Sequence, residues 1–273
     1  MPERLRPTLA EAIARHGLDA RKSLGQHFLL DPSITGRIAA LPGPLEGRHV
    51  VEVGPGPGGL TRALLDAGAA SVTAIEVDPR AAALIGELAA GEDGRLRLIE
   101  ADATRLDLAG LTGTPRQVVA NLPYNVGTPL LVGWLRQAAL WERLTLMFQL
   151  EVAERICAAP DTDAYGRLAV LAQWVCTTDI VLRVPPGAFV PPPKVWSAVV
   201  RLTPREKQPD PVLFGAMERL TAAAFGQRRK MLRGALAGLG GEALLERAGI
   251  DPRRRAETLS VAEFERLAGC LVS

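Results

Sequence analysis

Short apolar runs alternate with amphipathic segments over the first two thirds of the chain. The runs have the length and composition of buried strands, and the segments between them carry apolar residues at helical spacing. The predicted strands are 49–53, 72–78, 96–100, 118–120, 144–149, 177–184 and 195–202. The predicted helices are 8–16, 32–41, one that ends at about 67, 128–139, 151–158 and 165–174. Strands that alternate with helices predict an α/β fold with a mostly parallel, seven-stranded sheet.

The pattern changes after a polar segment bounded by prolines, TPREKQPDP at 203–211. Beyond this segment only helical patterns follow, at 212–225, 230–237, 242–248 and 261–267. A polar stretch rich in proline is typical of a boundary between domains. We therefore predict an α/β domain over 1–203, with an N-terminal lid segment, and a small all-helical C-terminal domain over 204–273.

The most informative polar residues follow the predicted strand 118–120, in the sequence NLPYN at 121–125. Ligands of open α/β sheets bind at the edge where the parallel strands end. The Asn121 side-chain oxygen and the Leu122 carbonyl can each accept one N–H of an exocyclic amino group, and the Tyr124 ring offers a stacking face. Such a site suits an adenine whose N6 lone pair faces an electrophile. The alternative is an ordinary turn, since Asn and Pro are common turn residues.

A glycine-rich turn, GPGPGGLT at 54–61, follows the predicted strand 49–53. Gly54, Gly56 and Gly59 allow backbone N–H groups to approach a ligand and let the chain turn tightly into a helix. The next two predicted strands lead to the acids Glu76 and Asp102. A carboxylate at 76 can accept hydrogen bonds from both hydroxyls of a ribose, and Asp102 can accept one from an adenine amino group. These residues predict a nucleoside-binding edge.

The nucleoside could belong to NAD or to S-adenosylmethionine, because the three glycines fit the G-x-G-x-x-G pattern of dinucleotide-binding turns. Pro55 and Pro57, however, remove two amide N–H groups that could hold a pyrophosphate. Asp102 suits a nucleoside that lies along the edge of the sheet. S-adenosylmethionine carries a ribose and an adenine without phosphate. The spacing therefore favours S-adenosylmethionine and leaves an NAD-dependent oxidoreductase as the alternative.

Two further segments have both a structural and a functional interpretation. The polar loop 21–29 ends in an apolar pair; it is either a linker or a lid in which Gln26 and His27 offer hydrogen bonds. The segment FVPPPKV at 189–195 is either a stiff connection or the support of Phe189 as a second stacking face opposite Tyr124. The tryptophans at 134, 141, 174 and 196 fall in helical or strand patterns and are predicted to be core residues.

Composition narrows the class of protein. The chain has 273 residues, of which 48% are hydrophobic, so it can bury a sizeable core. No apolar run reaches the roughly 18–20 residues of a membrane span, and the first residues lack the apolar core of a signal peptide. The three cysteines are odd in number and have no metal-ligand spacing. We expect a cytoplasmic, disulfide-free protein with no bound metal and no membrane contact.

Positive charge is concentrated in one part of the chain, although the net charge is only +2. The segment 183–233 carries ten Lys or Arg against three acidic residues, a local net charge of +7. Two clusters stand out, Arg228, Arg229 and Lys230, and then Arg253 and Arg254 with their neighbour at 255. Such clusters are either solvated faces or contacts for nucleic-acid phosphates. We predict that the five named residues bind RNA.

Taken together, the motifs resemble one family, and they occur in the family's order. The chain resembles the KsgA-type (RsmA) ribosomal RNA small-subunit adenine dimethyltransferases over nearly its whole length. The matching segments are SLGQHFL (23–29), VEVGPGPGGLT (51–61), IEVDP (75–79), EADA (100–103), NLPYN (121–125), FQLEVAERI (148–156), YGRL (165–168), FVPPPKVWSAVV (189–200), AFGQRRKMLR (224–233) and RRAETLSVAEF (254–264). Many relatives carry Asn where this chain has His27, and both side chains can form hydrogen bonds.

The resemblance implies a Rossmann-like class I methyltransferase domain that uses S-adenosylmethionine. In the family the donor is contacted at positions that match His27, Leu29, Gly54, Glu76, Asp102 and Asn121; to these we add Gln26 and Gly56 from their motifs. The family dimethylates two adjacent adenosines in a hairpin loop near the 3′ end of 16S rRNA. The expected catalytic residues are Asn121, Leu122, Tyr124 and Phe189.

The resemblance also implies the partner, the small ribosomal subunit, and a role in its biogenesis. The family includes macrolide-resistance methyltransferases that act on large-subunit rRNA and relatives of mitochondrial transcription factors. The segments 189–200 and 224–233 favour the small-subunit branch. A non-catalytic RNA-binding or assembly factor on the same fold stays an alternative. We expect a monomer.

Overall fold

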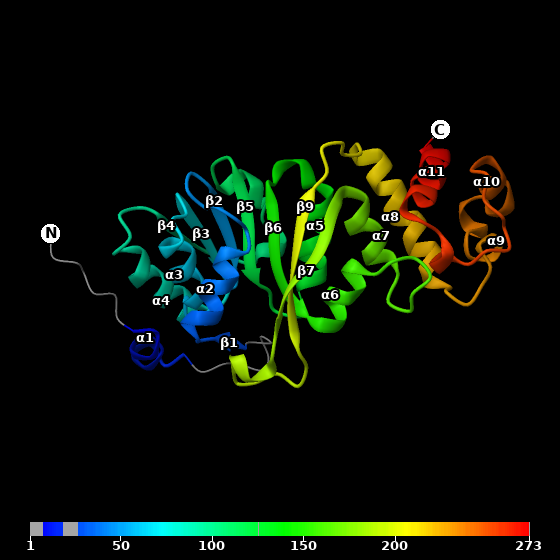
Figure 1. The fold of residues 1–273 in the computed structure, drawn as a ribbon. Helices are drawn as coiled ribbons and strands as arrows, with labels where there is room; N and C mark the ends of the chain where they lie inside the picture. The colour runs from blue at the N-terminus through cyan, green and yellow to red at the C-terminus, as the bar shows by residue number, and fades with distance from the viewer. Residues whose placement is uncertain (1–7, 19–26, 125, 273) are drawn as a thin grey trace. The chain divides into compact units, whose positions relative to one another are not determined.

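The computed structural model of the protein describes residues 8–18, 27–124 and 126–272 (Figure 1). Gln26, most of the predicted lid segment and the last residue of the NLPYN motif lie outside the described residues. Among the described residues, one compact unit comprises those up to Leu131 with Leu140–Ala153 and Ile180–Leu202, and a second comprises Val132–Ala139, Glu154–Asp179 and those from Thr203 on. The division of the chain into domains at residue 203 stays a prediction.

A seven-stranded sheet has the strand order β4-β3-β2-β5-β6-β9-β7. Its strands are β2 (His49–Val53), β3 (Ser71–Glu76), β4 (Leu96–Glu100), β5 (Arg116–Asn121), β6 (Arg143–Gln149), β7 (Cys176–Val184) and β9 (Ser197–Pro204). The five strands from β2 to β6 pair in parallel, and β9 is antiparallel to β6. The predicted α/β class and the mostly parallel sheet of seven strands are confirmed. The strand order reverses between β2 and β5, the position at which open α/β sheets bind ligands.

The strand sequences account for the positions of the strands in the sheet. β2, β5 and β6 are central and almost continuously buried, which is why they read as apolar runs without alternation. β4 is an edge strand, and its two charged residues, Arg97 and Glu100, are exposed. β5 extends one residue beyond the predicted run, so that Asn121 is its last residue. The Asn121 side chain therefore starts from a fixed backbone at the carboxyl edge.

Three helices connect parallel strands of the sheet, and they are α3 (Gly59–Asp66), α4 (Pro79–Ala89) and α5 (Gly127–Arg136). The helices α1 (Leu9–His16) and α2 (Pro32–Ala40) precede β2, and α6 (Leu150–Cys157) and α7 (Arg167–Val175) lie between β6 and β7. Thr8 and Glu11 form a capping box at the start of α1, and Asp31 and Asp78 cap α2 and α4 by accepting backbone N–H groups. α2 packs against α3, and α4 packs along β4 (Figure 1).

The C-terminal part of the chain is helical, as predicted. It contains α8 (Pro211–Gly226), α9 (Leu232–Ala235), α10 (Gly241–Arg247) and α11 (Val261–Val272). α8 packs against α7 and α11, and Trp174 stacks on Phe214 with ring centroids 5.8 Å apart. The helix predicted over 230–237 is shorter, because Gly234 and Gly238 weaken helix formation and the chain continues as a 3₁₀ turn at Ala237–Leu239.

Short elements complete the described structure. β1 (Phe28–Leu29) and β8 (Phe189–Val190) form a separate two-stranded antiparallel sheet in which Leu29 pairs with Phe189. The 3₁₀ turns are η2 (Ala103–Arg105), η3 (Leu108–Leu111), η4 (Ala138–Leu140), η5 (Pro186–Ala188), η6 (Ala237–Leu239) and η7 (Ala256–Thr258). In the described ranges, no helix is both long and apolar enough to cross a membrane, and no group of three metal-ligating side chains gathers.

One of the four tryptophans predicted as core is not in the core. Trp134, Trp141 and Trp174 are buried, but Trp196 is 48% exposed. Trp196 comes directly before β9, and the next residue, Ser197, is fully buried. Side chains alternate between the two faces of an extended chain, so the inward direction of Ser197 turns the indole outward. The prediction of a buried Trp196 was wrong because its position just before β9 places it on the face opposite to Ser197.

Candidate functional site

A cavity lies at the carboxyl ends of β2, β3 and β5, where the strand order of the sheet reverses. It brings together predicted site residues that are far apart in the sequence, which are His27, Leu29, Gly54, Gly56, Glu76, Asn121, Leu122 and Tyr124. The function of these residues stays a prediction, but their common position is a feature of the fold. We therefore expect a ligand to bind in this cavity.

The glycine-rich turn packs directly against β1. Gly54 and Gly56 have φ angles of +69° and +53°, which L side chains rarely adopt. A Cβ atom on Gly56 would lie 3.2 Å from the Phe28 ring, and one on Gly59 would lie 2.6 Å from the Leu29 carbonyl oxygen. The absence of side chains therefore lets β1 and the turn form adjoining walls of the cavity, with backbone groups close to a ligand.

Glu76 presents a buried carboxylate to the cavity from the end of β3. It accepts hydrogen bonds from the backbone N–H groups of Gly56 at 3.1 Å, Val77 at 2.8 Å and Asp78 at 2.9 Å. Burial raises the pKa of Glu76 above its ordinary value, and the three N–H donors counteract that rise. The carboxylate is held in one orientation, as a group that binds hydroxyls requires.

Asn121 is oriented by the chain that enters β1. Its Nδ2 donates to the His27 carbonyl at 3.4 Å, which leaves Oδ1 as an acceptor on the side of the cavity. The amide orientation is assigned from this hydrogen bond. The His27 ring donates from Nδ1 to the Pro191 carbonyl at 2.8 Å, and its centroid lies 5.6 Å from that of Tyr124. His27 thus connects the segments that carry Asn121, Tyr124 and Pro191.

The Tyr124 ring is anchored at its hydroxyl. The hydroxyl lies 2.9 Å from Ser197 Oγ, and Ser197 is fully buried at the start of β9. Partial burial raises the pKa of the Tyr124 phenol, so the ring stays neutral around pH 7. A half-buried, neutral ring with a fixed hydroxyl is a suitable stacking surface for a flat ligand.

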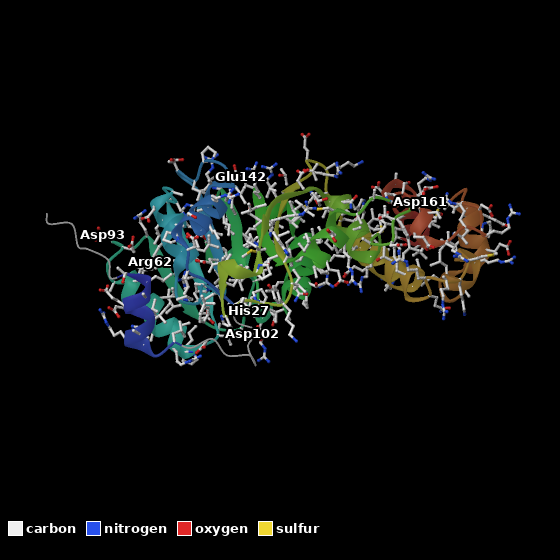
Figure 2. The ribbon with its side chains drawn as sticks, turned by 60° about the horizontal axis from the view of Figure 1, so that its bottom comes forward. His27, Arg62, Asp93, Asp102, Glu142 and Asp161 are labelled. Atoms are coloured by element: carbon white, nitrogen blue, oxygen red, sulfur yellow. The ribbon has the colours of Figure 1, made fainter. Side chains whose placement is uncertain are left out.

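Two predicted site residues do not line the cavity. Phe189 is 2% exposed and belongs to the hydrophobic core next to its partner Leu29 in the small sheet. Asp102 caps the turn η2, where Oδ1 accepts from Thr104 N at 2.9 Å and from Thr104 Oγ1 at 2.7 Å. These hydrogen bonds lower the pKa of Asp102. Asp102 is therefore the N-cap of η2, directly after the end of β4 (Figure 2).

Other cavity residues were missed by the sequence analysis. Glu52 lines the cavity from β2, and Phe28, Leu60 and Val77 add apolar surface. Glu52 carried a signal that could have been used: it stands among valines in a strand predicted to be buried, and buried carboxyls are rare without a role. The three apolar residues gave no such signal, because their sequence neighbours do not show which way they face.

The predicted RNA-binding residues fall into two groups, all within the second unit. The side chains of Arg229 and Lys230 are exposed and form no hydrogen bond or ion pair with any described residue, although the Lys230 backbone N–H donates to the Gln227 carbonyl. Arg228 donates to the carbonyls of Thr162 and Asp163, and Arg253 pairs with Asp251 at 3.1 Å. The fifth residue, Arg254, is more deeply engaged and has a structural role of its own.

Arg254 links η7 to α11. It pairs with Glu263 at 2.5 Å and donates to the Thr258 carbonyl at 2.6 Å. The hydrogen bond from Arg254 lowers the pKa of Glu263 to about 2, from an ordinary value of 4.5. A carboxyl whose pKa is lowered in the folded state stabilises the fold above its unfolded pKa, and this contribution is lost as the pH falls from about 4.5 to 2. Arg254 therefore has a structural role, which is to hold η7 against α11.

Comparisons with known proteins agree with this geometry. The family described as "Ribosomal RNA adenine dimethylase" matches residues 17–272. The chain is 66% identical over 262 residues to "Ribosomal RNA small subunit methyltransferase A" of Gluconobacter oxydans, covering 96% of this chain and 86% of that protein. It is 57% identical to the protein of the same name in Sinorhizobium medicae, covering 97% of each chain.

Two solved structures are also similar. A dimethyladenosine transferase from Plasmodium falciparum superposes with a TM-score of 0.74 at 25% identity, covering 88% of this chain and 96% of that one. The 23S rRNA methyltransferase ErmE gives a TM-score of 0.66 at 26% identity, covering 90% and 100%. The identities to the two bacterial proteins are more than twice those to the two solved structures.

Proposed function

The chain belongs to the ribosomal RNA adenine dimethylase family, and from this premise we propose that it dimethylates the N6 amino groups of two adjacent adenosines in a hairpin loop near the 3′ end of 16S rRNA. S-adenosylmethionine is the methyl donor. The observation that carries the proposal is the shared cavity of Asn121, Leu122 and Tyr124 with the buried carboxylate of Glu76. The NAD-dependent alternative is wrong for a chain of this family.

The cavity fits the donor. The buried Glu76 carboxylate suits the two ribose hydroxyls, and the turn of Gly54 and Gly56 leaves space that a Cβ would fill. Leu29 and the His27 backbone form the adjoining wall. When bound, S-adenosylmethionine supplies an electrophilic methyl group on a sulfonium. Both hydrogen bonds from Thr104 fall on Asp102 Oδ1, so Oδ2 is the oxygen that can accept from the adenine amino group of the donor.

The substrate adenine has to leave its stack, at a cost of a few kcal/mol that is smaller in a loop than in a duplex. Stacking on Tyr124 offsets that cost by about 1–3 kcal/mol. Asn121 Oδ1 and the Leu122 carbonyl accept the two amino protons and hold the N6 lone pair toward the donor. Positioning of this kind supplies much of the rate of a transfer between two bound groups. Phe189 would become a second stacking surface only after moving out of the core.

The first methyl removes one N–H from the nitrogen, so Asn121 and Leu122 cannot both keep a hydrogen bond in the second transfer. Methylation also makes the nitrogen more acidic, and the proton that leaves can go to water. None of the described cavity residues is required as a general base for this step. We propose that the enzyme works as a monomer on the small ribosomal subunit and contributes to its biogenesis.

The test is transfer of labelled methyl to small subunits that lack this modification, with the modified nucleosides identified by mass. N6,N6-dimethyladenosine near the 3′ end of 16S rRNA is expected. Label confined to large-subunit rRNA would place the chain with enzymes that act on that subunit. Absence of transfer to any RNA would contradict the proposed activity, even if the protein still bound the donor and the subunit.

Tyr124→Phe is expected to lower kcat by less than about fivefold, because the ring keeps its stacking face and loses only a hydrogen bond worth about 1 kcal/mol. Ser197→Ala, which removes the same hydrogen bond from the other side, should have a similar effect. Tyr124→Ala removes the face itself and should lower kcat/KM by about tenfold or more. Single-turnover transfer to small subunits measures all three. Equal losses for Phe and Ala would contradict the stacking role.

Replacement of both Arg229 and Lys230 by Ala is expected to raise the KM for small subunits and to leave kcat and unfolding unchanged. Each lost phosphate contact should reduce the slope of log affinity against log salt by about 0.7–0.9. Arg254→Ala is the contrasting variant: it removes the ion pair with Glu263 and should lower the free energy of unfolding. Measurement of subunit binding at several salt concentrations distinguishes the double variant from Arg254→Ala. If the double variant leaves the slope of log affinity against log salt unchanged, Arg229 and Lys230 contact solvent and not RNA phosphates.

A further inference from the structure

Glu52 is a buried carboxyl that the proposed reaction does not use. It lies on β2, is 1% exposed and lines the cavity next to the glycine-rich turn. Thr61 Oγ1, on α3, donates a hydrogen bond to Glu52 Oε2 at 2.7 Å. In the part of the chain that the structure describes, this hydroxyl is its hydrogen-bond donor. An ionised carboxylate in such a place would be poorly compensated.

The contrast with Glu76 shows which of the two carboxyls holds the charge. Three backbone N–H groups donate to Glu76, and N–H donors favour the ionised form. Burial, with a smaller contribution from the charge of Glu76, raises the pKa of Glu52 to about 8, and the hydrogen bond from Thr61 counteracts this only in part. With a pKa of about 8, the carboxyl of Glu52 is mostly protonated at neutral pH, whereas the three N–H donors favour a carboxylate at Glu76.

The groups that face Glu52 are few in the described structure. Glu76 approaches from β3 and Thr61 from α3, and His27 lines the same cavity from the segment before β1. Asn121 at the end of β5 is neutral. With no cation among the β2, β3, β5 and α3 groups that line this cavity, a ligand can supply the charge that would ionise Glu52.

We propose that Glu52 selects the charged methyl donor over the spent product, because its carboxyl loses a proton when the cationic sulfonium ligand binds and regains one when the ligand is the neutral thioether. The inference rests on the assignment of S-adenosylmethionine to this cavity. On donor binding, one proton passes from Glu52 to solvent. After transfer the sulfur keeps the electron pair of the S–CH₃ bond and becomes neutral, and Glu52 takes up a proton from solvent.

The consequence is a linkage between pH and ligand choice. Below the pKa of Glu52, raising the pH should tighten S-adenosylmethionine binding relative to S-adenosylhomocysteine, because the donor binds best to the ionised form. Both ligands carry the same amino and carboxylate groups, so their affinity ratio isolates the effect of the sulfonium. Product release would be favoured once the charge on sulfur is gone, which helps an enzyme that must exchange its donor between successive transfers.

The experiment is titration calorimetry of the full chain with each ligand at pH 7, in phosphate and in Tris, whose ionisation enthalpies differ. The difference in observed enthalpy should report release of up to one proton with S-adenosylmethionine and no release with S-adenosylhomocysteine. Glu52→Gln keeps the acceptor for Thr61 but cannot ionise. It should abolish the release and reduce the preference for the donor by about tenfold, the equivalent of one pKa unit.

Glu92→Gln is the matched control, since Glu92 is also a buried acid, pairs with Arg95 and does not line the cavity. This variant should retain both the proton release and the affinity ratio. Equal proton release with the two ligands, or an unchanged ratio in Glu52→Gln, would overturn the inference. Failure of S-adenosylmethionine to bind at all would instead contradict the donor assignment and the inference together. If Glu52→Gln does not fold, the wild-type measurements decide alone.

Discussion

Asn121→Ala is expected to lower the rate of methyl transfer by at least tenfold, and by on the order of 10²–10³ if the amide acts mainly in the transition state. The hydrogen bond from Nδ2 to the His27 carbonyl leaves Oδ1 to receive an amino proton of the substrate. Alanine removes that acceptor and leaves the N6 lone pair conjugated with the ring. The effect should be larger on kcat than on the KM for small subunits.

Single-turnover transfer, with donor affinity measured separately by calorimetry, gives the result. Donor affinity has to be included because Asn121 also lines the predicted donor site. Thermal unfolding should be nearly unchanged, since Asn121 is only partly buried at the end of β5. A variant that keeps more than a tenth of the wild-type rate at saturating donor would show that Asn121 does not hold the reacting amino group.

Gly59→Ala is expected to have the second large effect, on stability and on donor binding together. A Cβ at this position would lie 2.6 Å from the Leu29 carbonyl oxygen, which is a backbone atom and cannot turn aside. Either β1 or the start of α3 has to shift, at a cost of about 1–3 kcal/mol. Since Leu29 and Gly59 both line the cavity, we also expect donor affinity to fall by about tenfold or more, which is about 1.4 kcal/mol.

Gly36→Ala is the control for this substitution. Gly36 lies within α2, its φ is not positive, and a Cβ there would meet nothing within 4 Å. Alanine should therefore be neutral or stabilise the fold by up to about 1 kcal/mol, because it favours the helix. Urea unfolding and donor titration of both variants form the comparison. A harmless Gly59→Ala would mean that β1 does not pack on the turn as closely as the structure has it.

Periodicity predicted the fold well because the central strands are buried on both faces. A strand with apolar neighbours above and below it must be apolar throughout, and β2, β5 and β6 are such strands. Periodicity was less successful at the edges of elements. Trp196 was predicted to be buried, but the alternation of side chains before β9 turns it outward, and α9 is shorter than predicted because glycines weaken the helix.

The cavity residues that the sequence identified were those whose chemistry is unusual for their position. The sequence alone identified the polar residues Asn121, Tyr124 and Glu76 near strand ends. It also identified the glycine-rich turn at 54–61, in which prolines alternate with glycines. Glu52 was missed although a carboxyl in a valine strand is equally unusual. Phe189 and Asp102 were predicted from their sequence positions as well as by resemblance. Phe189 lies in the core and Asp102 caps η2, so their functional roles stay predictions.

The sequence by itself determined the class of fold, the order of the elements and the family, because these follow from local hydrophobic patterns and from sequence motifs that can be recognised without a structure. Only the tertiary structure decided which motifs meet, since the cavity joins the segments around His27, Gly56 and Asn121, which are far apart along the chain. The tertiary structure also decided that Glu52 is buried with a raised pKa. It further decided that Arg254 forms a structural ion pair with Glu263, whereas the Arg229 side chain is exposed. Burial and partners set these properties, and both depend on contacts that no local pattern encodes.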